Sequence, residues 1–261
     1  MLAAGVLVCA VAATAAYALT NNTVKYGVTL KSKGKPKKGK AVPTSYRGVL
    51  DVATDNGTQP NVAPTTKIYF AKQLVQNAKY FPKCDPKKLD GQTTVPASCK
   101  KAVVGKGTAT ASGGAPGGAI NPATTESLTV TAYNGLKGKQ LLLAVNGSSP
   151  LVISNRVIVG TLGKGSGPYG YTITFAVPAD LQFQLGLQVA LTHFDVTTSA
   201  KTITAKIKGK KKKVSYLSLA SCPKSHKLPV KTVVNFDQDG APGGPGTPGG
   251  QVGTFTGSFK C

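Results

Sequence analysis

Short segments in which apolar and polar residues alternate recur along the chain, and they constrain the fold more than any other feature. In residues 24–31, Val24, Tyr26, Val28 and Leu30 share one face, and lysines and a threonine occupy the other. The same period of two recurs in residues 171–177 and 202–208. This is the period of a β-strand with one buried face. The sequence therefore predicts half-buried strands.

Turn signals separate these segments. Asn-Gly pairs at 56–57, 134–135 and 146–147 predict tight turns, because both residues accept positive φ angles. Gly/Pro-rich stretches at 112–124 and 239–251 predict loops, the second a long mobile hairpin loop. Residues 71–81 predict one short helix that lacks an N-terminal cap. Residues 178–182 predict a single helical turn.

This pattern predicts an all-β fold. Thr, Val, Ala and Gly are abundant and Trp is absent, a composition that suits strands and turns. We expect an antiparallel β-sandwich, Ig-like or jelly-roll-like, with long Gly/Pro/Lys loops and two disulfides. Residues 19–261 would form a single domain, which is an ordinary size for an all-β protein. The alternative is that 112–124 links two domains.

The first 18 residues are apolar and rich in small side chains, and they predict a secretory signal peptide. Ala16, Tyr17 and Ala18 fit the small-x-small pattern of a signal peptidase site. No Lys or Arg precedes the apolar stretch, which departs from the usual signal. A retained membrane anchor is the alternative. With cleavage, we expect an extracellular or cell-wall-associated protein with no integral membrane association.

Cleavage would remove Cys9 and leave four cysteines, an even number that predicts disulfides in an exported chain. Four cysteines allow three pairings. We favour the sequence neighbours, Cys84 with Cys99 and Cys222 with Cys261. The second bridge would tie a C-terminal hairpin (222–261). Metal binding is not expected, because CxxC spacing is absent and the histidines are His193 and His226.

Positive charge is the dominant surface feature. The chain has 32 Lys and Arg against 9 Asp and Glu, a net charge of +23. Such a surface attracts polyanions. Lysine is a hydrated point charge, better suited to diffuse attraction than to bidentate recognition. Two runs concentrate the charge, and the candidate polyanion-binding residues are Lys31, Lys33, Lys35, Lys37, Lys38, Lys40, Lys208, Lys210, Lys211, Lys212 and Lys213.

Both runs contain or adjoin glycines, so we expect exposed loops, with Lys208–Lys213 at a hairpin tip. Two interpretations remain open. The lysines form a polyanion-binding surface, or they only prevent strand edges from aggregating.

Two segments resemble motifs of a group of secreted, functionally uncharacterised β-sandwich proteins of soil actinobacteria. They are FPKCDPKKLDG…ASCKKAVVGKGTATA (81–111) and SYLSLASCPKSHKLPVKTVVNFDQDG (215–240), the latter followed by a C-terminal cysteine. The resemblance spans most of the chain after the signal. It implies export, a β-sandwich and the two disulfides favoured above, and it implies no activity. The chain departs from the pattern at Leu228, where an aromatic residue is frequent.

No catalytic motif supports an enzyme. The chain lacks GxSxG, and its single glutamate and eight aspartates are a thin supply for a glycosidase carboxylate pair. Leu191, His193 and Asp195 are expected on one face of a strand as a surface pair, and His226 in a solvated loop. We expect neither catalysis nor a cofactor.

The function expected from the sequence is therefore non-catalytic, with anionic wall polymer or polysaccharide as the partner of the lysine runs. Specific nucleic-acid binding is not expected, because the runs contain no aromatic residue for stacking. The alternative is a carbohydrate-binding or hydrolytic module, for which Tyr69, Tyr171 and Phe175 would have to be exposed in a groove. The oligomeric state stays open.

Overall fold

A computed structural model describes residues 21–37, 40–237 and 248–261. Residues 1–18, for which a signal peptide is expected, lie outside these residues, as do Lys38 and most of the second Gly/Pro-rich stretch. The strands, in chain order, are β1 Asn22–Ser32, β2 Val42–Thr54, β3 Thr65–Ala71, β4 Leu74–Gln76, β5 Val103–Gly114, β6 Thr125–Asn134, β7 Gln140–Gly147, β8 Ile153–Lys164, β9 Tyr169–Ala176, β10 Phe183–Gln184, β11 Leu187–Thr198, β12 Thr202–Ile207, β13 Lys210–Ser215, β14 Leu217–Leu219, β15 Lys227–Asp237 and β16 Pro248–Lys260. The helices are single turns: α1 Pro86–Leu89, α2 Ala97–Lys100, α3 Ala179–Gln182, and the 3₁₀ turns η1 Ala78–Tyr80, η2 Pro122–Thr124 and η3 Leu136–Gly138.

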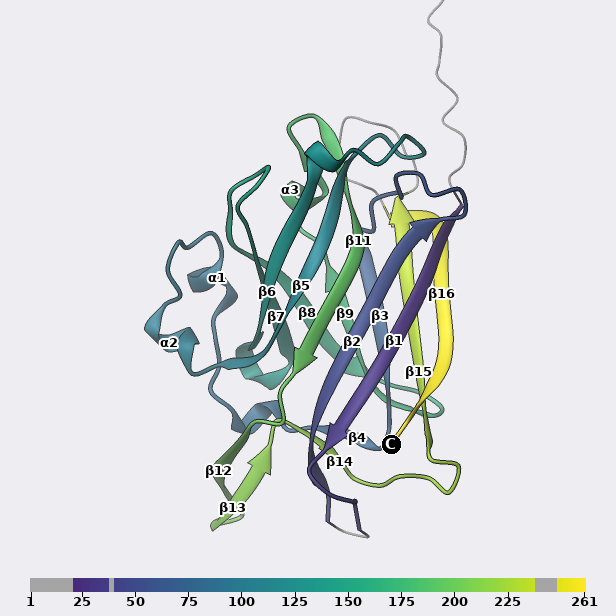
Figure 1. Ribbon diagram of the computed structural model, residues 1–261. Coiled ribbons are helices and arrows are strands. Elements are labelled where there is room, and N and C mark those ends of the chain that lie inside the picture. The colour runs from purple at the N-terminus through teal and green to yellow at the C-terminus, as the bar shows by residue number, and fades with distance from the viewer. Residues whose placement is uncertain (1–20, 38–39, 238–247) are drawn as a thin grey trace, which may run out of the picture.

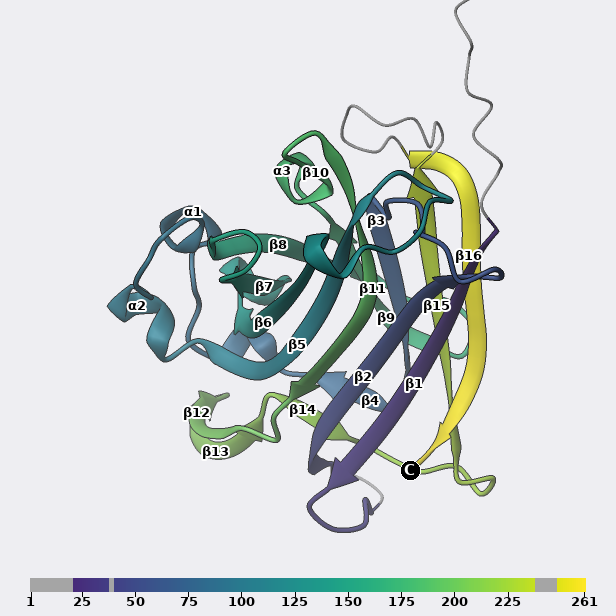
Figure 2. The ribbon, with the colours of Figure 1, turned by 45° about the horizontal axis from the view of Figure 1, so that its top comes forward.

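The expected antiparallel β-sandwich is confirmed, and its two layers come from one sheet that curls over. The strand order is β16-β15-β3-β9-β8-β7-β6-β5-β11-β2-β14-β4, with β1 paired to β2 and β10 to β11. The curl brings β16 beside β1 (Figures 1 and 2), where the Gln251 carboxamide bonds both the backbone and the side chain of Asn22. Strands from both halves of the chain are interspersed in this sheet. Residues 112–114, expected in a loop, belong to β5, and residues 115–124 connect β5 to its paired strand β6. The hairpin β12–β13 forms a second, small sheet.

The alternating apolar and polar residues of the sequence point to the interior and to the outer face of the sheet, respectively. Tyr26 in β1 and Ile173 and Phe175 in β9 face the interior, as expected. Aromatic side chains fill the interior at the end of the molecule that contains the turn between β1 and β2. The Tyr26 and Tyr46 hydroxyls are hydrogen-bonded at 2.9 Å, and Phe70 stacks on Tyr171 with ring centroids 4.7 Å apart. Burial raises the pKa of Tyr26, Tyr46 and Tyr171 above that of an exposed tyrosine.

Both favoured disulfides are present, Cys84–Cys99 and Cys222–Cys261. They close loops of 15 and 39 residues, and the loop-entropy model assigns each about 3 to 4 kcal/mol. The loop of the first bridge contains α1 and ends within α2, in a segment that projects from the sheet (Figure 1). The second joins the C-terminus to the loop before β15, at the base of the β15–β16 hairpin.

The expected helix at 71–81 is wrong. The segment contains β4 and η1, because Leu74 pairs with Leu219 of β14 and the backbone is used for the sheet. Tertiary pairing here overrides a weak local helix preference. The single turn expected at 178–182 is confirmed as α3.

Two of the three Asn-Gly turns are also wrong. Asn134 is buried, and its amide donates to the carbonyls of Ala78 and Pro82 at 2.9 Å, so the turn after β6 falls later, at Lys137 and Gly138 with positive φ. Asn146 and Gly147 belong to β7. Asn56-Gly57 does form a turn, with Gly57 at φ +73°. Residues 248–251, expected in a loop, begin β16.

Candidate functional site

The first lysine run lies at the turn between β1 and β2. Lys31 is still part of β1 and pairs with Ser45. The chain then turns, and Lys37 and Lys40 form an isolated antiparallel bridge. The lysines of this run that the structure describes are all exposed, and Lys38 lies outside the described residues.

The second run lies on the β12–β13 hairpin, but most of it is strand. The turn is the pair Lys208-Gly209, both with positive φ. Lys210–Lys213 belong to β13, so the expectation that Lys208–Lys213 sit at a hairpin tip is wrong for four of the five lysines. All four are exposed, and the hairpin is not hydrogen-bonded into the main sheet, although Ile203 and Ile207 of β12 pack against the main core.

The pairing of strands places lysine directly opposite lysine three times. The pairs are Lys37 with Lys40, Lys206 with Lys211, and Lys227 with Lys260. Like charges directly opposite each other on neighbouring strands are destabilising. Three such pairs concentrate positive charge that the fold itself does not relieve.

All three pairs lie at one end of the molecule, which we call the lysine end. It comprises the β1–β2 turn, the β12–β13 hairpin and the region around the Cys222–Cys261 bridge (Figure 1). Within the described part of the chain, the ion pairs are formed by Arg47, Arg156 and His193. No ion pair between described residues therefore neutralises the lysine end.

The aromatic residues of the carbohydrate alternative do not share an exposed groove. Phe175 is buried, and Tyr171 stacks on Phe70 inside the fold. Tyr69 lies apart from them, half-buried beside Tyr169, with the Lys67 and Lys231 ammonium groups 5.2 and 5.4 Å from its ring centroid. The sequence-based sugar site thus has only one of its three rings in reach of a ligand on the outer sheet face.

The expectation that Leu191 shares a face with His193 and Asp195 is wrong, whereas His193 and Asp195 do share an outer face. A β-bulge between Leu191 and His193 adds a residue and reverses the alternation. Leu191 therefore lines the interior, while His193 and Asp195 lie on the outside. His193 Nδ1 is 2.6 Å from Asp51 Oδ1, and Asp195 pairs with Arg47, whose hydrogen bond lowers the pKa of Asp195. His226 is exposed in its loop, as expected.

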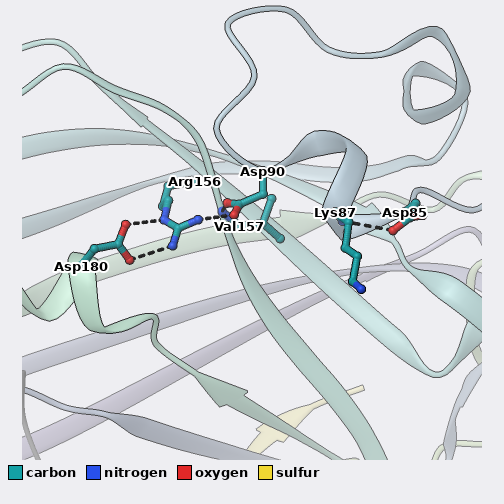
Figure 3. Close-up of polar contacts among 6 residues, drawn as sticks. All are labelled: Asp85, Lys87, Asp90, Arg156, Val157 and Asp180. Carbon is teal, nitrogen blue, oxygen red and sulfur yellow. Dashed lines mark hydrogen bonds and ion pairs between the residues drawn. The ribbon is translucent and has the colours of Figure 1, made fainter.

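A second charged cluster centres on Arg156 of β8 (Figure 3). Its guanidinium bonds both carboxylate oxygens of Asp180 in α3, at 2.6 and 2.9 Å, and also pairs with Asp90. Asp90 in turn accepts the backbone N–H of Val157. The hydrogen bond from Arg156 lowers the pKa of Asp180. The cluster connects α3 and the segment after α1 to the sheet. Helix α1 itself begins with an N-cap, since Asp85 accepts the Lys87 backbone N–H.

The sequence analysis missed a cavity. At the end opposite the lysine end, the two layers enclose an apolar space of about 350 Å³ that Glu126 lines. A signal was present, because Glu126 occupies an inward position in phase with Leu128 and Val130 of β6. Small residues at Ala109, Ala111 and Gly113 of β5 leave the space unfilled.

The fold and its charged end define a two-disulfide, all-β protein with a lysine-covered end. A scan against family models found no match, and comparisons with curated proteins and solved structures gave no similar chain. In the part of the chain that the structure describes, no group of three or more His, Cys, Asp or Glu could hold a metal ion. Over the same residues, no helix has the length and apolarity needed to cross a membrane.

Proposed function

We propose that the protein is an exported, non-catalytic protein that adheres to anionic wall polymer or polysaccharide through its lysine end. Two disulfides support export, since such bonds persist in oxidising surroundings. The observation that carries the proposal is the gathering of the three opposed lysine pairs at one end. An anionic polymer lying across them would replace repulsion by attraction.

The chemistry of this end favours diffuse attraction to a flexible polymer. Its cations are lysines, each a point charge on a flexible stem, and they present no planar fork to a single phosphate or carboxylate. The described lysines of this end are exposed and form no ion pair with a described acid, so binding would release counterions and weaken steeply as salt rises. Adhesion of this kind discriminates among polymers by their charge density.

The test is binding to isolated Gram-positive cell walls across a salt series. One variant changes Lys33, Lys35, Lys37, Lys210, Lys211 and Lys212 to Gln. A matched control removes the same charge from exposed lysines elsewhere, and its positions are Lys25, Lys83, Lys87, Lys88, Lys100 and Lys106. We expect the lysine-end variant to lose most of its binding and to show a shallower salt dependence, while the control keeps most of both.

If both variants lose wall binding equally, net charge alone explains the binding, and the proposal of a dedicated lysine end is refuted. Unchanged wall binding, together with aggregation of the lysine-end variant, would favour the alternative that these lysines only protect strand edges. Walls stripped of their anionic polymers supply a further arm, in which the wild-type protein should no longer bind.

A further inference from the structure

The interior cavity has the size and lining of a small-molecule site. Its volume is about 350 Å³, within the range of about 300 to 1,000 Å³ of ligand pockets. Apolar side chains from both layers line it, including Leu50, Ala109 and Phe194 on one side and Ile68, Ile158 and Phe175 on the other. An apolar cavity of about 150 Å³ is enough to bind benzene. By contrast, the space left in the aromatic half of the interior is about 60 Å³.

One polar group in this lining stands out. Glu126, the only glutamate of the chain, is 4% exposed. Its Oε2 accepts the Leu151 backbone N–H at 3.0 Å, whereas its Oε1 has no hydrogen-bond partner among the described residues. A buried carboxylate oxygen without a donor costs free energy, which a donor brought by a ligand would recover.

The neighbouring strands make room for this carboxyl group. A Cβ at Gly147 of β7 would lie 2.2 Å from Glu126 Oε1, so only glycine leaves the space that the oxygen occupies. On the other side, Ala111 of β5 is the direct cross-strand partner of Glu126 and adds little bulk. Glu126 thus sits at a gap in the packing and is one of the residues that line the cavity.

The mouth of the cavity is apolar. Leu185 lines it, is 83% exposed, and takes a left-handed φ of +51° in the two-residue turn from β10 to β11. This conformation is uncommon for a residue other than glycine, asparagine or aspartate. Val152, next to the cavity-lining Leu151, is 84% exposed. The Arg156–Asp180 ion pair holds α3, which contributes Leu181 to the lining.

The segments that form this end contain no cation. Residues 53–64, 112–128, 146–155 and 176–188 include no Lys or Arg, although the chain has 32. They do include Asp55, Glu126 and Asp180, of which Asp180 is already paired with Arg156 of the adjoining strand β8. The local charge at the mouth therefore favours a neutral or cationic ligand over an anionic one.

We propose that the cavity binds a small, largely apolar molecule carrying a hydrogen-bond donor, an alcohol or an amine, whose donor meets Glu126 Oε1. The apolar body would lie between the two layers, and the head would face the unpartnered oxygen. This site is separate from the lysine end, and the proposal holds whether or not that end binds a polymer.

The test uses N-phenyl-1-naphthylamine, a fluorescent apolar probe with one N–H donor, and competitors of equal chain length. The wild-type protein should bind the probe. Decan-1-ol and decylamine should displace the probe at concentrations about tenfold lower than decanoic acid requires. Adsorption to the lysine surface predicts the opposite order, because that surface attracts the acid. No probe binding, or preference for the acid, would overturn the proposal.

The substitution Glu126→Gln sharpens the test because it preserves shape. Its amide oxygen can still accept the Leu151 N–H, and its NH₂ then faces the cavity as a donor. We expect the preference to shift by about tenfold or more toward decanoic acid, which offers acceptors. The control Asp55→Asn removes the same charge from an exposed carboxylate and should leave the order unchanged.

A third variant, Ala111→Phe, places a ring beside Glu126 and should abolish probe binding, and a cooperative thermal unfolding transition reports that the variant is folded. If Glu126→Gln leaves the competitor order unchanged, or if Ala111→Phe leaves probe binding unchanged, the cavity site is refuted. Because Glu126→Gln is isosteric, the result does not depend on whether the larger substitution folds.

Discussion

The two ends of the molecule differ in surface charge and in how the interior is filled. At the lysine end, paired strands place lysine against lysine, and the interior beneath is filled by aromatic rings. At the cavity end, the connecting segments carry no cation, and the interior is hollow. The difference shows that each end has a feature that β-sandwich packing alone does not require. One end carries unrelieved charge, and the other carries unfilled apolar volume with a buried carboxyl group.

The largest effect expected from this comparison concerns packing. Phe70 contacts Tyr46 and Tyr171 in the filled half, so Phe70→Ala should lower the free energy of unfolding by about 3 to 5 kcal/mol. Ala109 borders the cavity, so Ala109→Val has room and should change it by less than about 1 kcal/mol. Urea denaturation of both variants measures the contrast. An overpacking cost of about 2 kcal/mol for Ala109→Val would show that the cavity end is packed as tightly as the rest.

Acid should weaken the cavity end through Arg156. Its hydrogen bond lowers the pKa of Asp180 below the usual 3.8. The stabilisation is therefore present above pH 3.8 and is lost as the pH falls through the lower, folded-state pKa. Arg156→Met should cost about 1 kcal/mol at neutral pH and flatten the melting temperature profile below about pH 4.

A matched control comes from the other arginine. Arg47→Met removes the ion pair with Asp195 on the outer face of the sheet, away from α3. It should produce a similar acid profile and leave the affinity for the naphthylamine probe unchanged, whereas Arg156→Met should weaken that affinity by loosening α3. Equal probe affinities in the two variants would show that α3 does not shape the mouth.

The smallest effect tests the opposed lysines. Lys211→Glu turns the pair with Lys206 from repulsive to attractive and should raise stability by about 0.5 kcal/mol at low salt. The control Lys213→Glu faces Thr204 instead and should gain less. Thermal unfolding at low and high salt measures both, and the gap should close as salt screens the charges. If the two variants gain equally, cross-strand repulsion is not the source of the effect.

The sequence predicted what depends on local pattern. The alternation placed Tyr26, Ile173 and Phe175 inside, and the sequence neighbours among the cysteines gave the correct bridges. It failed where distant strands decide. The bulge at Leu191 and His193 reversed a face that strict alternation predicted, and Asn134 was buried by contacts with Ala78 and Pro82.

The candidate sites divide in the same way. The lysine runs are visible in the sequence, but their pairing across strands is not, since Lys227 and Lys260 are far apart in the chain. The cavity was missed because its volume depends on which small residues of β5 face which strands of the other layer. Glu126 in an apolar alternation was the one readable sign.

The central claim is that the two ends bind different ligands independently. The most direct measurement is a titration of the naphthylamine probe into protein already held on dextran sulfate beads, compared with free protein. We predict the same stoichiometry and an affinity within about twofold, because ligands at uncoupled sites leave each other's equilibria unchanged. Release of the probe by the polymer, or loss of probe capacity on the beads, would show that the two ligands compete for one charged surface and would contradict the account.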